Sequence, residues 1–447
     1  MKWANNTAYF LLIFCVIFTT VVYGAVHQPT LAVFYVLVFA MVVLWVADCY
    51  KRGEVRISSS RLQVPVFLAT LYGAIQIIPF GWYSESGVDN IPRTISVDPF
   101  STESAAVHLL ALSFYLSAAL LLIDRAGRIR QMVRVITIFG FIFAFFAIVQ
   151  GVLSPTKIYG IYERPLAQPY GSFVNRHNFA AYMEMTIAIP LALVLTGAIK
   201  RDQRLLYLTA IVLMSVALFL SGSRGGLFSL VAEILFLVMI TAPVRKGKRL
   251  ILRLGLAVAL LLAVVGGTIF VGGESSLTRL SESASSKDVT SNRTQIWTVA
   301  GDVIVHNFPF GAGLGAFGVA YTPTDPLSGS ERVEQAHNDY LQAITDAGII
   351  GIFLGGLLIY FLVRTFLRNL ETRNQYRRAV VIGAGAGIFA VLFHSLFDFV
   401  LHTTAVALLF IVLIALMVAA GFKYADDVHS DKTPSRKRGD LVPLPHR

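Results

Sequence analysis

The sequence predicts an all-α polytopic membrane protein with about 12 transmembrane helices and one large outer loop that contains short helices. The composition, the apolar runs and the placement of Lys and Arg predict this fold class. Of the 447 residues, 56% are hydrophobic and 14% are charged, whereas soluble domains carry roughly 25% charged residues. Most of the protein surface therefore faces something other than water.

Twelve apolar runs approach the roughly 20 residues that a helix needs to cross the hydrocarbon core of a bilayer. They cover residues 8–27, 31–49, 62–80, 105–123, 133–152, 178–199, 205–220, 227–241, 254–272, 346–366, 379–398 and 404–421. The first run is long for the core of a signal peptide, and Gly24 and Ala25 give a poor cleavage site. We therefore expect it to be a retained helix.

The basic residues predict the orientation of these helices. If the N-terminus is cytoplasmic, 28 of the 37 Lys and Arg residues lie on the cytoplasmic side and 9 on the other side, as the positive-inside rule requires. Both termini are then cytoplasmic, and the net charge of +11 reflects topology rather than nucleic-acid binding. Residues 1–421 form the membrane domain, and the basic tail 422–447 is predicted to be disordered.

The outer side holds the unusual polar residues, in segments 81–104, 153–177, 221–226 and 273–345. A loop as long as the last segment is uncommon unless it is functional or has structure of its own. Residues 292–305 have a helical pattern, and Gly311, Gly313 and Gly315 mark a turn. This glycine spacing is no dinucleotide fingerprint, because no strand–helix context surrounds it. Cys15 and Cys49 lie in apolar runs and offer neither a disulfide framework nor a metal site.

Arg224 stands in the turn Ser221-Gly222-Ser223-Arg224-Gly225-Gly226 between two apolar runs. A guanidinium beside backbone amides at a helix end suits an anion such as a phosphate. The alternative interpretation is an arginine that extends to the membrane surface from a tight turn.

Asn175, Arg176 and Asn178 stand where another helix is predicted to begin. Anions are favoured at such a position. Simple N-capping by Asn175 or Asn178 is the alternative.

His337 lies where the large outer loop is predicted to re-enter the membrane, in Gln335-Ala336-His337-Asn338-Asp339-Tyr340-Leu341. An imidazole with a pKa near 6.5 can accept a proton from a hydroxyl at neutral pH, although a single histidine can also be structural. Asp339 nearby either orients or charges the imidazole or caps the next helix.

His394, Asp398 and His402 are spaced four residues apart, which places them on one stripe if the helix continues through them. Ionisable residues this deep in a membrane usually face a polar interior. A metal site is conceivable from these ligand types, but we favour a network of ion pairs and hydrogen bonds, because no further carboxylate or cysteine cluster is evident.

These motifs together resemble the O-antigen ligase/polymerase superfamily of bacterial inner membranes. The arginine turn at 221–226 is similar to that family's turn between two spans, and His337-Asn338 followed by Gly348-Ile349-Ile350-Gly351 matches its His-Asn…Gly-x-x-Gly pattern. Further similarities are Arg293 with Trp297, Pro309 before the glycine turn, Gly171 to Asn178, and His394 to Asp398. The resemblance covers about residues 165–405, and the His-Asn…Gly-x-x-Gly spacing is its most specific part.

The resemblance implies a multi-pass enzyme of the bacterial inner membrane whose site faces the periplasm. Such enzymes transfer a glycan from undecaprenyl diphosphate to an acceptor hydroxyl, without a metal or other cofactor. The acceptor is a lipid A–core sugar for ligases, a growing glycan for O-antigen or exopolysaccharide polymerases, and a protein side chain for protein O-oligosaccharyltransferases. We expect a ligase, with a polymerase as the first alternative.

The residues can support this chemistry. Arginines stabilise a departing diphosphate through bidentate contacts, and a histidine can act as the base for the incoming hydroxyl. We expect His337 and Arg224 to be catalytic and Arg224, Arg293, Arg176 and Arg164 to bind the diphosphate. The supporting residues expected are Asn175, Asn178, Asn338, Asp339, His394 and Asp398.

Two other classes of protein are less consistent with the sequence. A polysaccharide transporter would show broken helices and polar residues near the midplane, often in repeated halves, whereas here the unusual residues stand at outer helix ends. A membrane scaffold without catalysis would leave the placement of Arg224 and His337 unexplained.

Overall fold

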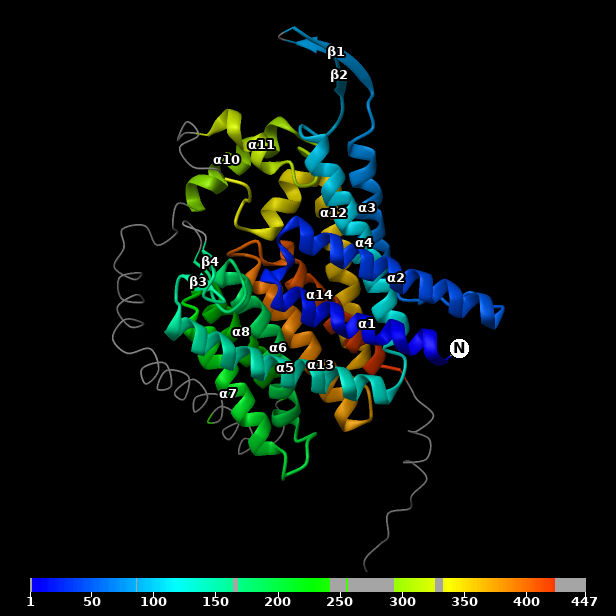
Figure 1. Cartoon of the computed structure of the whole chain (residues 1–447), viewed down its shortest axis with the longest axis vertical. Coiled ribbons are helices and arrows are strands. Elements are labelled where there is room, and N and C mark those ends of the chain that lie inside the picture. The colour runs from blue at the N-terminus through cyan, green and yellow to red at the C-terminus, as the bar shows by residue number, and fades with distance from the viewer. Residues whose placement is uncertain are drawn as a thin grey trace, which may run out of the picture.

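The computed structural model describes residues 2–85, 87–163, 168–241, 255, 293–325 and 333–422. Within these ranges the chain is a helical bundle with a smaller outer layer of hairpins and short helices (Figure 1). The bundle helices are α1 (Lys2–Val21), α2 (Gln28–Arg52), α3 (Gln63–Gln76), α4 (Pro99–Leu122), α5 (Ala126–Leu153), α6 (Arg176–Thr196), α7 (Arg204–Leu220), α8 (Arg224–Thr241), α12 (Asp339–Asn369), α13 (Gln375–His394) and α14 (Thr404–Ala420).

Eight of the described helices are long and apolar enough to cross a membrane: α1, α2, α4, α5, α6, α8, α12 and α13. The apolar helices α7 and α14 are shorter, with 17 residues each, and α3 has 14. These helices correspond to all the predicted apolar runs but one. The run 254–272 lies outside the described residues apart from position 255, so the total of 12 spans stays a prediction.

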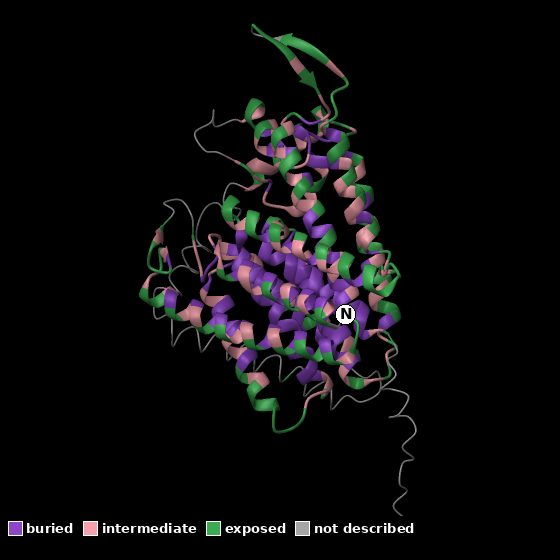
Figure 2. Ribbon diagram, turned by 45° about the vertical axis from the view of Figure 1, so that its right-hand side comes forward, coloured by how far each residue is buried: buried purple, intermediate pink, exposed green. Residues whose placement is uncertain are grey.

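The core of the bundle consists of α6, α13 and α14, whose residues are almost all buried. Figure 2 shows this buried centre surrounded by helices with exposed outer faces. Small residues let the central helices approach closely, because a Cβ at Gly383 of α13 would lie only 2.6 Å from the Cα of Ile189 in α6. Close backbone contact of this kind is typical of helices packed in membranes.

The outer layer contains two hairpins and the described part of the long loop. The hairpins are β1 (Gly81–Glu85) with β2 (Val88–Arg93), and β3 (Lys157–Ile158) with β4 (Tyr162–Glu163). The loop contributes α10 (Arg293–His306), α11 (Phe317–Tyr321) and the 3₁₀ turn η2 (Thr322–Thr324). Helix α10 confirms the helix predicted at 292–305, and positive φ angles at Gly311, Gly313 and Gly315 confirm the predicted turn. A small apolar cluster that includes Val299, Ala300, Phe317 and Ala336 packs α10 against α11 and the segment before α12.

Helix α12 begins seven residues earlier than the apolar run at 346–366 suggested, and it bends at Gly348, which has φ 57° and ψ −138°. At this bend the Ile349 N–H donates to the carbonyl oxygen of Pro309 at 3.0 Å. A side chain at Gly348 would overlap that carbonyl group. The first glycine of the Gly-x-x-Gly pattern thus lets α12 pack against the turn of the outer layer.

Several predicted runs extend beyond their helices. The run at 8–27 passes the end of α1 at Val21, and the run at 178–199 passes the end of α6 at Thr196. Helix α3 ends at Gln76, before Pro79, and α13 ends at His394 rather than at 398. After α13 the chain forms a turn and the 3₁₀ helix η3 (Val400–His402). Contacts with the segment before α12 replace the helix there: the Ser395 carbonyl accepts the Asp339 N–H at 3.0 Å. The connection that leads into α12 and the connection between α13 and α14 are therefore joined backbone to backbone.

Candidate functional site

A strap formed by residues 336–339 leads into α12 and lies against the turn formed by residues 395–403, between α13 and α14. Asn338 caps α12, because its Oδ1 accepts the N–H groups of Tyr340 and Leu341, and its Nδ2 donates to the Leu396 carbonyl at 3.0 Å. The Ala336 carbonyl accepts from the indole N–H of Trp297 at 2.9 Å. The strap is thereby fixed to the turn on one side and to α10 on the other.

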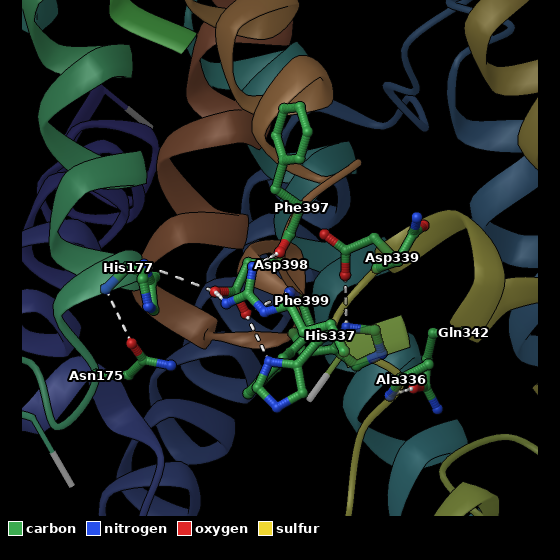
Figure 3. Close-up of polar contacts among 12 residues, drawn as sticks. Asn175, His177, Ala336, His337, Asp339, Gln342, Phe397, Asp398 and Phe399 are labelled. Atoms are coloured by element: carbon green, nitrogen blue, oxygen red, sulfur yellow. Dashed lines mark hydrogen bonds and ion pairs between the residues drawn. The ribbon is translucent and has the colours of Figure 1, made fainter. Parts of the chain in front are cut away.

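Asp398 is the centre of the site, because its carboxylate contacts residues from three other segments (Figure 3). Nη2 of Arg293 lies 2.9 Å from its Oδ2, and Nδ1 of His337 lies 3.3 Å from its Oδ1. Nδ1 of His177 lies 3.7 Å from Oδ2. Arg293 also donates to the Phe397 carbonyl. The side chain of Asp398 is only 1% exposed, and a buried carboxylate requires such partners.

The charge state of Asp398 follows from these partners. Burial raises the pKa of its carboxyl group, but the hydrogen bond with His337 and the positive charge of Arg293 lower it more strongly. The net effect is a pKa well below the ordinary value. The group is therefore a carboxylate at neutral pH, and it can hold Arg293 and orient His337.

His337 stands in a strained and partly open position. Its φ angle is +50°, in the left-handed region that residues with side chains seldom adopt and that is enriched at functional sites. The ring packs edge-on against Phe399, with 4.9 Å between ring centroids. Because Nδ1 faces Asp398, the other ring nitrogen is available to a ligand, and the side chain is 32% exposed.

The N-termini of α6 and α8 meet beside Asp398. Asn175 caps α6 by accepting the His177 N–H at 2.8 Å. The Ser223 hydroxyl caps α8 by accepting the Gly226 N–H at 3.2 Å, and it also lies 2.8 Å from Nδ1 of His177. Arg176 Nη1 approaches Gly222, since it would lie 3.4 Å from a Cβ there. The arginine turn and the Asn-Arg-His segment are therefore neighbours in space.

Arg224 is the first residue of α8, next to Ser223, and Arg293 and His337 each contact Asp398. Asn178 is buried within α6 and is not its cap, a position that Asn175 takes. Arg164 lies outside the described residues.

The interpretation of His394, Asp398 and His402 as one helical stripe was wrong, because α13 ends at His394. The expected ion pairs are present, but each residue has a different partner. His394 pairs with Glu184 at 2.8 Å, Asp398 with Arg293, and His402 with Asp339 at 2.8 Å. Asp339 thus contacts an imidazole, but that of His402 rather than that of His337. The cap of α12 is Asn338 and not Asp339.

Sequence reasoning missed two groups of residues at or below the site. His177 and Ser223 stand inside two of the motifs but were not predicted to be site residues, yet they connect the helix ends to Asp398. Glu184 and Glu233 are completely buried in α6 and α8. Their signal in the sequence was a single carboxylate in each of two apolar runs, which alone marks a position of functional interest.

Part of the chain is similar to a known protein family. Residues 209–355 match a family model described as O-Antigen ligase, and no curated protein matches the chain. The matched segment contains Arg224, Arg293 and His337, whereas Arg176, His177 and Asp398 lie outside it and are brought to it by the fold. This match over residues 209–355 confirms the resemblance of the chain to the O-antigen ligase/polymerase superfamily.

Proposed function

We propose that the chain is a ligase-like glycosyltransferase that moves a glycan from undecaprenyl diphosphate to a hydroxyl of a lipid A–core sugar. The reaction takes place at the periplasmic face of the inner membrane and needs no metal. The observation that carries the proposal is the cluster around Asp398, where one buried carboxylate positions both a guanidinium and an imidazole. A cation for the leaving group and a base for the nucleophile are the two groups that this transfer requires.

In the transfer, the acceptor oxygen forms a bond to the anomeric carbon of the donor glycan. The bond from that carbon to the diphosphate oxygen breaks, and its electron pair leaves with undecaprenyl diphosphate. The hydroxyl proton passes to the ring nitrogen of His337 that faces away from Asp398. Arg293 has five N–H donors, so it can keep its contact with Asp398 and still bind a phosphate oxygen. Arg176 and Arg224, on the neighbouring helix ends, supply further positive charge for the diphosphate.

The test uses the purified full-length chain in detergent with EDTA, undecaprenyl-diphosphate-linked glycan and lipid A–core. The parent protein should release undecaprenyl diphosphate as glycan appears on the acceptor. Arg293→Ala or Arg224→Ala should lower the rate about 10²–10³-fold, and His337→Ala about 10²–10⁴-fold.

Matched controls come from exposed residues away from Asp398. Arg364→Ala on α12 removes an arginine whose side chain contacts Tyr360, and His306→Ala on α10 removes a histidine bonded to its own helix. Both should keep the parent rate. Equal activity of His337→Ala, Arg224→Ala and the parent would show that the site assignment is wrong.

Glycan analysis of a deletion strain separates a ligase from a polymerase. Loss of all attached glycan indicates a ligase. Retention of a single repeat unit on lipid A–core indicates a polymerase, which would correct the acceptor but keep the donor chemistry.

A further inference from the structure

The structure contains a second histidine–aspartate pair that the proposed transfer does not use. Nδ1 of His402 lies 2.8 Å from Oδ1 of Asp339. The other oxygen of that carboxylate accepts the Ser395 hydroxyl at 2.7 Å and the Leu401 N–H at 3.2 Å. The carboxylate is therefore fixed, and it holds the imidazole with its free nitrogen directed away from Asp339. The side chain of His402 is 42% exposed.

His402 lines a groove of about 420 Å³ between α2, α4 and the start of α14. Its walls include Gln28 and Tyr35 of α2 and Phe100, Glu103 and His108 of α4. The groove thus combines a carboxylate, an amide and imidazoles with aromatic and aliphatic side chains. Such a mixture fits a ligand that has hydroxyl groups on one part and apolar surface on another.

The charge of the groove differs from that of the Asp398 cluster. None of the described residues that line it is Lys or Arg, and Glu103 adds a carboxylate. The Asp398 cluster contains Arg293, with Arg176 and Arg224 on the adjacent helix ends. A diphosphate is favoured among arginines and disfavoured beside an unpaired carboxylate. The two regions therefore select ligands of different charge.

The groove and the Asp398 cluster share their framework. Asp339 is two residues from His337 on the strap, and His402 is four residues from Asp398 on the turn. The two pairs cross, since His337 contacts the turn at Asp398 while His402 contacts the strap at Asp339. A ligand held at His402 therefore lies against the same strap that carries the proposed base.

We infer that this groove binds the acceptor, as an uncharged, hydroxyl-bearing sugar of a glycolipid, with His402 and Glu103 as its hydrogen-bonding residues. The inference rests on the proposed function and assigns the acceptor a site apart from the donor's arginines. Phe100, which is 79% exposed, offers a ring face on which the sugar or its lipid part can pack.

The first test measures Michaelis constants for donor and acceptor separately, using undecaprenyl-diphosphate-linked glycan as donor. The acceptor is lipid A–core or a lipid-linked repeat unit, whichever supports turnover by the parent. His402→Phe and Glu103→Gln should each raise the acceptor KM about tenfold, as the loss of a hydrogen bond to a charged group predicts. The donor KM should stay unchanged. His306→Phe and Glu371→Gln, at exposed positions outside the groove, are matched controls and should change neither constant.

A second measurement does not depend on kinetics. Phe100 in the groove and Phe39 on the exposed side of α2 are replaced, one at a time, by the photoreactive p-benzoylphenylalanine. Position 100 should cross-link the acceptor, and position 39 should report only contact with bulk lipid. Equal cross-linking at both positions, or none at position 100 in active protein, would overturn the inference.

The outcomes separate the two proposals. If the parent transfers glycan and Arg293→Ala does not, but His402→Phe and Glu103→Gln keep the parent acceptor KM, the acceptor groove is wrong and the proposed function stands. If the parent transfers glycan to neither acceptor, the proposed function fails and the groove loses its basis. Thermal unfolding of each variant shows that an altered KM does not come from misfolding.

Discussion

Asp398 connects segments that are distant in the sequence. Its ionisation therefore determines how the stability contributed by these contacts depends on pH. Its pKa is lowered in the folded protein, so its contribution to stability is present above its ordinary pKa near 4 and is lost only as the pH falls through the lower folded value. Asp398→Asn leaves Arg293 without its carboxylate, which should cost about 3 kcal/mol. The difference in Tm between parent and variant should be constant between pH 5 and 8. A difference that shrinks between pH 7 and 5 would contradict this charge state.

The His402–Asp339 pair should show the opposite dependence on pH. Burial lowers the pKa of His402, but the hydrogen bond and the charge of Asp339 outweigh it and raise that pKa above its ordinary value. The stabilisation is therefore present below pH 6.5 and is lost as the pH rises through the raised value. It should stay below about 1 kcal/mol, because the imidazole is 42% exposed. Tm values of the parent and His402→Gln, measured from pH 6 to 9, should converge as the pH rises.

The sequence predicted which residue types matter but not how they pair. Arg293, His337 and Asp398 each stood in a recognisable motif, yet they are separated by up to 105 positions, and no local pattern encodes their contact. The partners of His394 and His402 were missed for a related reason. His394 pairs with Glu184, 210 positions away. The pairing of His402 depends on where α13 ends, and at that end the strap contacts the turn.

The bend in helix α12 depends on one residue, Gly348. A side chain at Gly348 would meet the Pro309 carbonyl and would also have to adopt φ 57°. Gly348→Ala should therefore cost about 1–3 kcal/mol and reduce transfer, because the strap before α12 carries His337. Gly355→Ala and Gly356→Ala are controls on the same helix, where an added Cβ meets no atom within 4 Å. Since alanine favours helix over glycine, they should be neutral or slightly stabilising. Thermal unfolding and transfer assays measure both effects, and equal stability of all three variants would remove the proposed role of Gly348.

The apolar runs predicted the number and order of the described bundle helices, but they did not predict where those helices begin and end. The residues 105–123 and 133–152 belong to helices that begin at Pro99 and Ala126. Helix α4 begins before its apolar part because Asp98 caps it by accepting the Ser101 N–H at 3.2 Å. Hydrophobicity shows what faces lipid, whereas caps and backbone contacts decide where a helix stops.

For the whole molecule, the distribution of Lys and Arg predicts the orientation of the chain in the membrane. This orientation can be tested with the folded protein. The β1–β2 hairpin joins α3 to α4 at the end that carries the site, and residues 197–203 join α6 to α7 at the other end. Asp89→Cys on the hairpin and Asp202→Cys in the α6–α7 connection are both exposed positions. Cys15 and Cys49 are buried and should contribute little background. If the basic loops are cytoplasmic, an impermeant maleimide should label Asp89→Cys in intact cells and Asp202→Cys only after the cells are opened.

Labelling of both cysteine variants in intact cells would show that the number of spans between positions 89 and 202 is wrong. Labelling of Asp202→Cys alone would place the Asp398 cluster in the cytoplasm, where a periplasmic glycan donor cannot reach it.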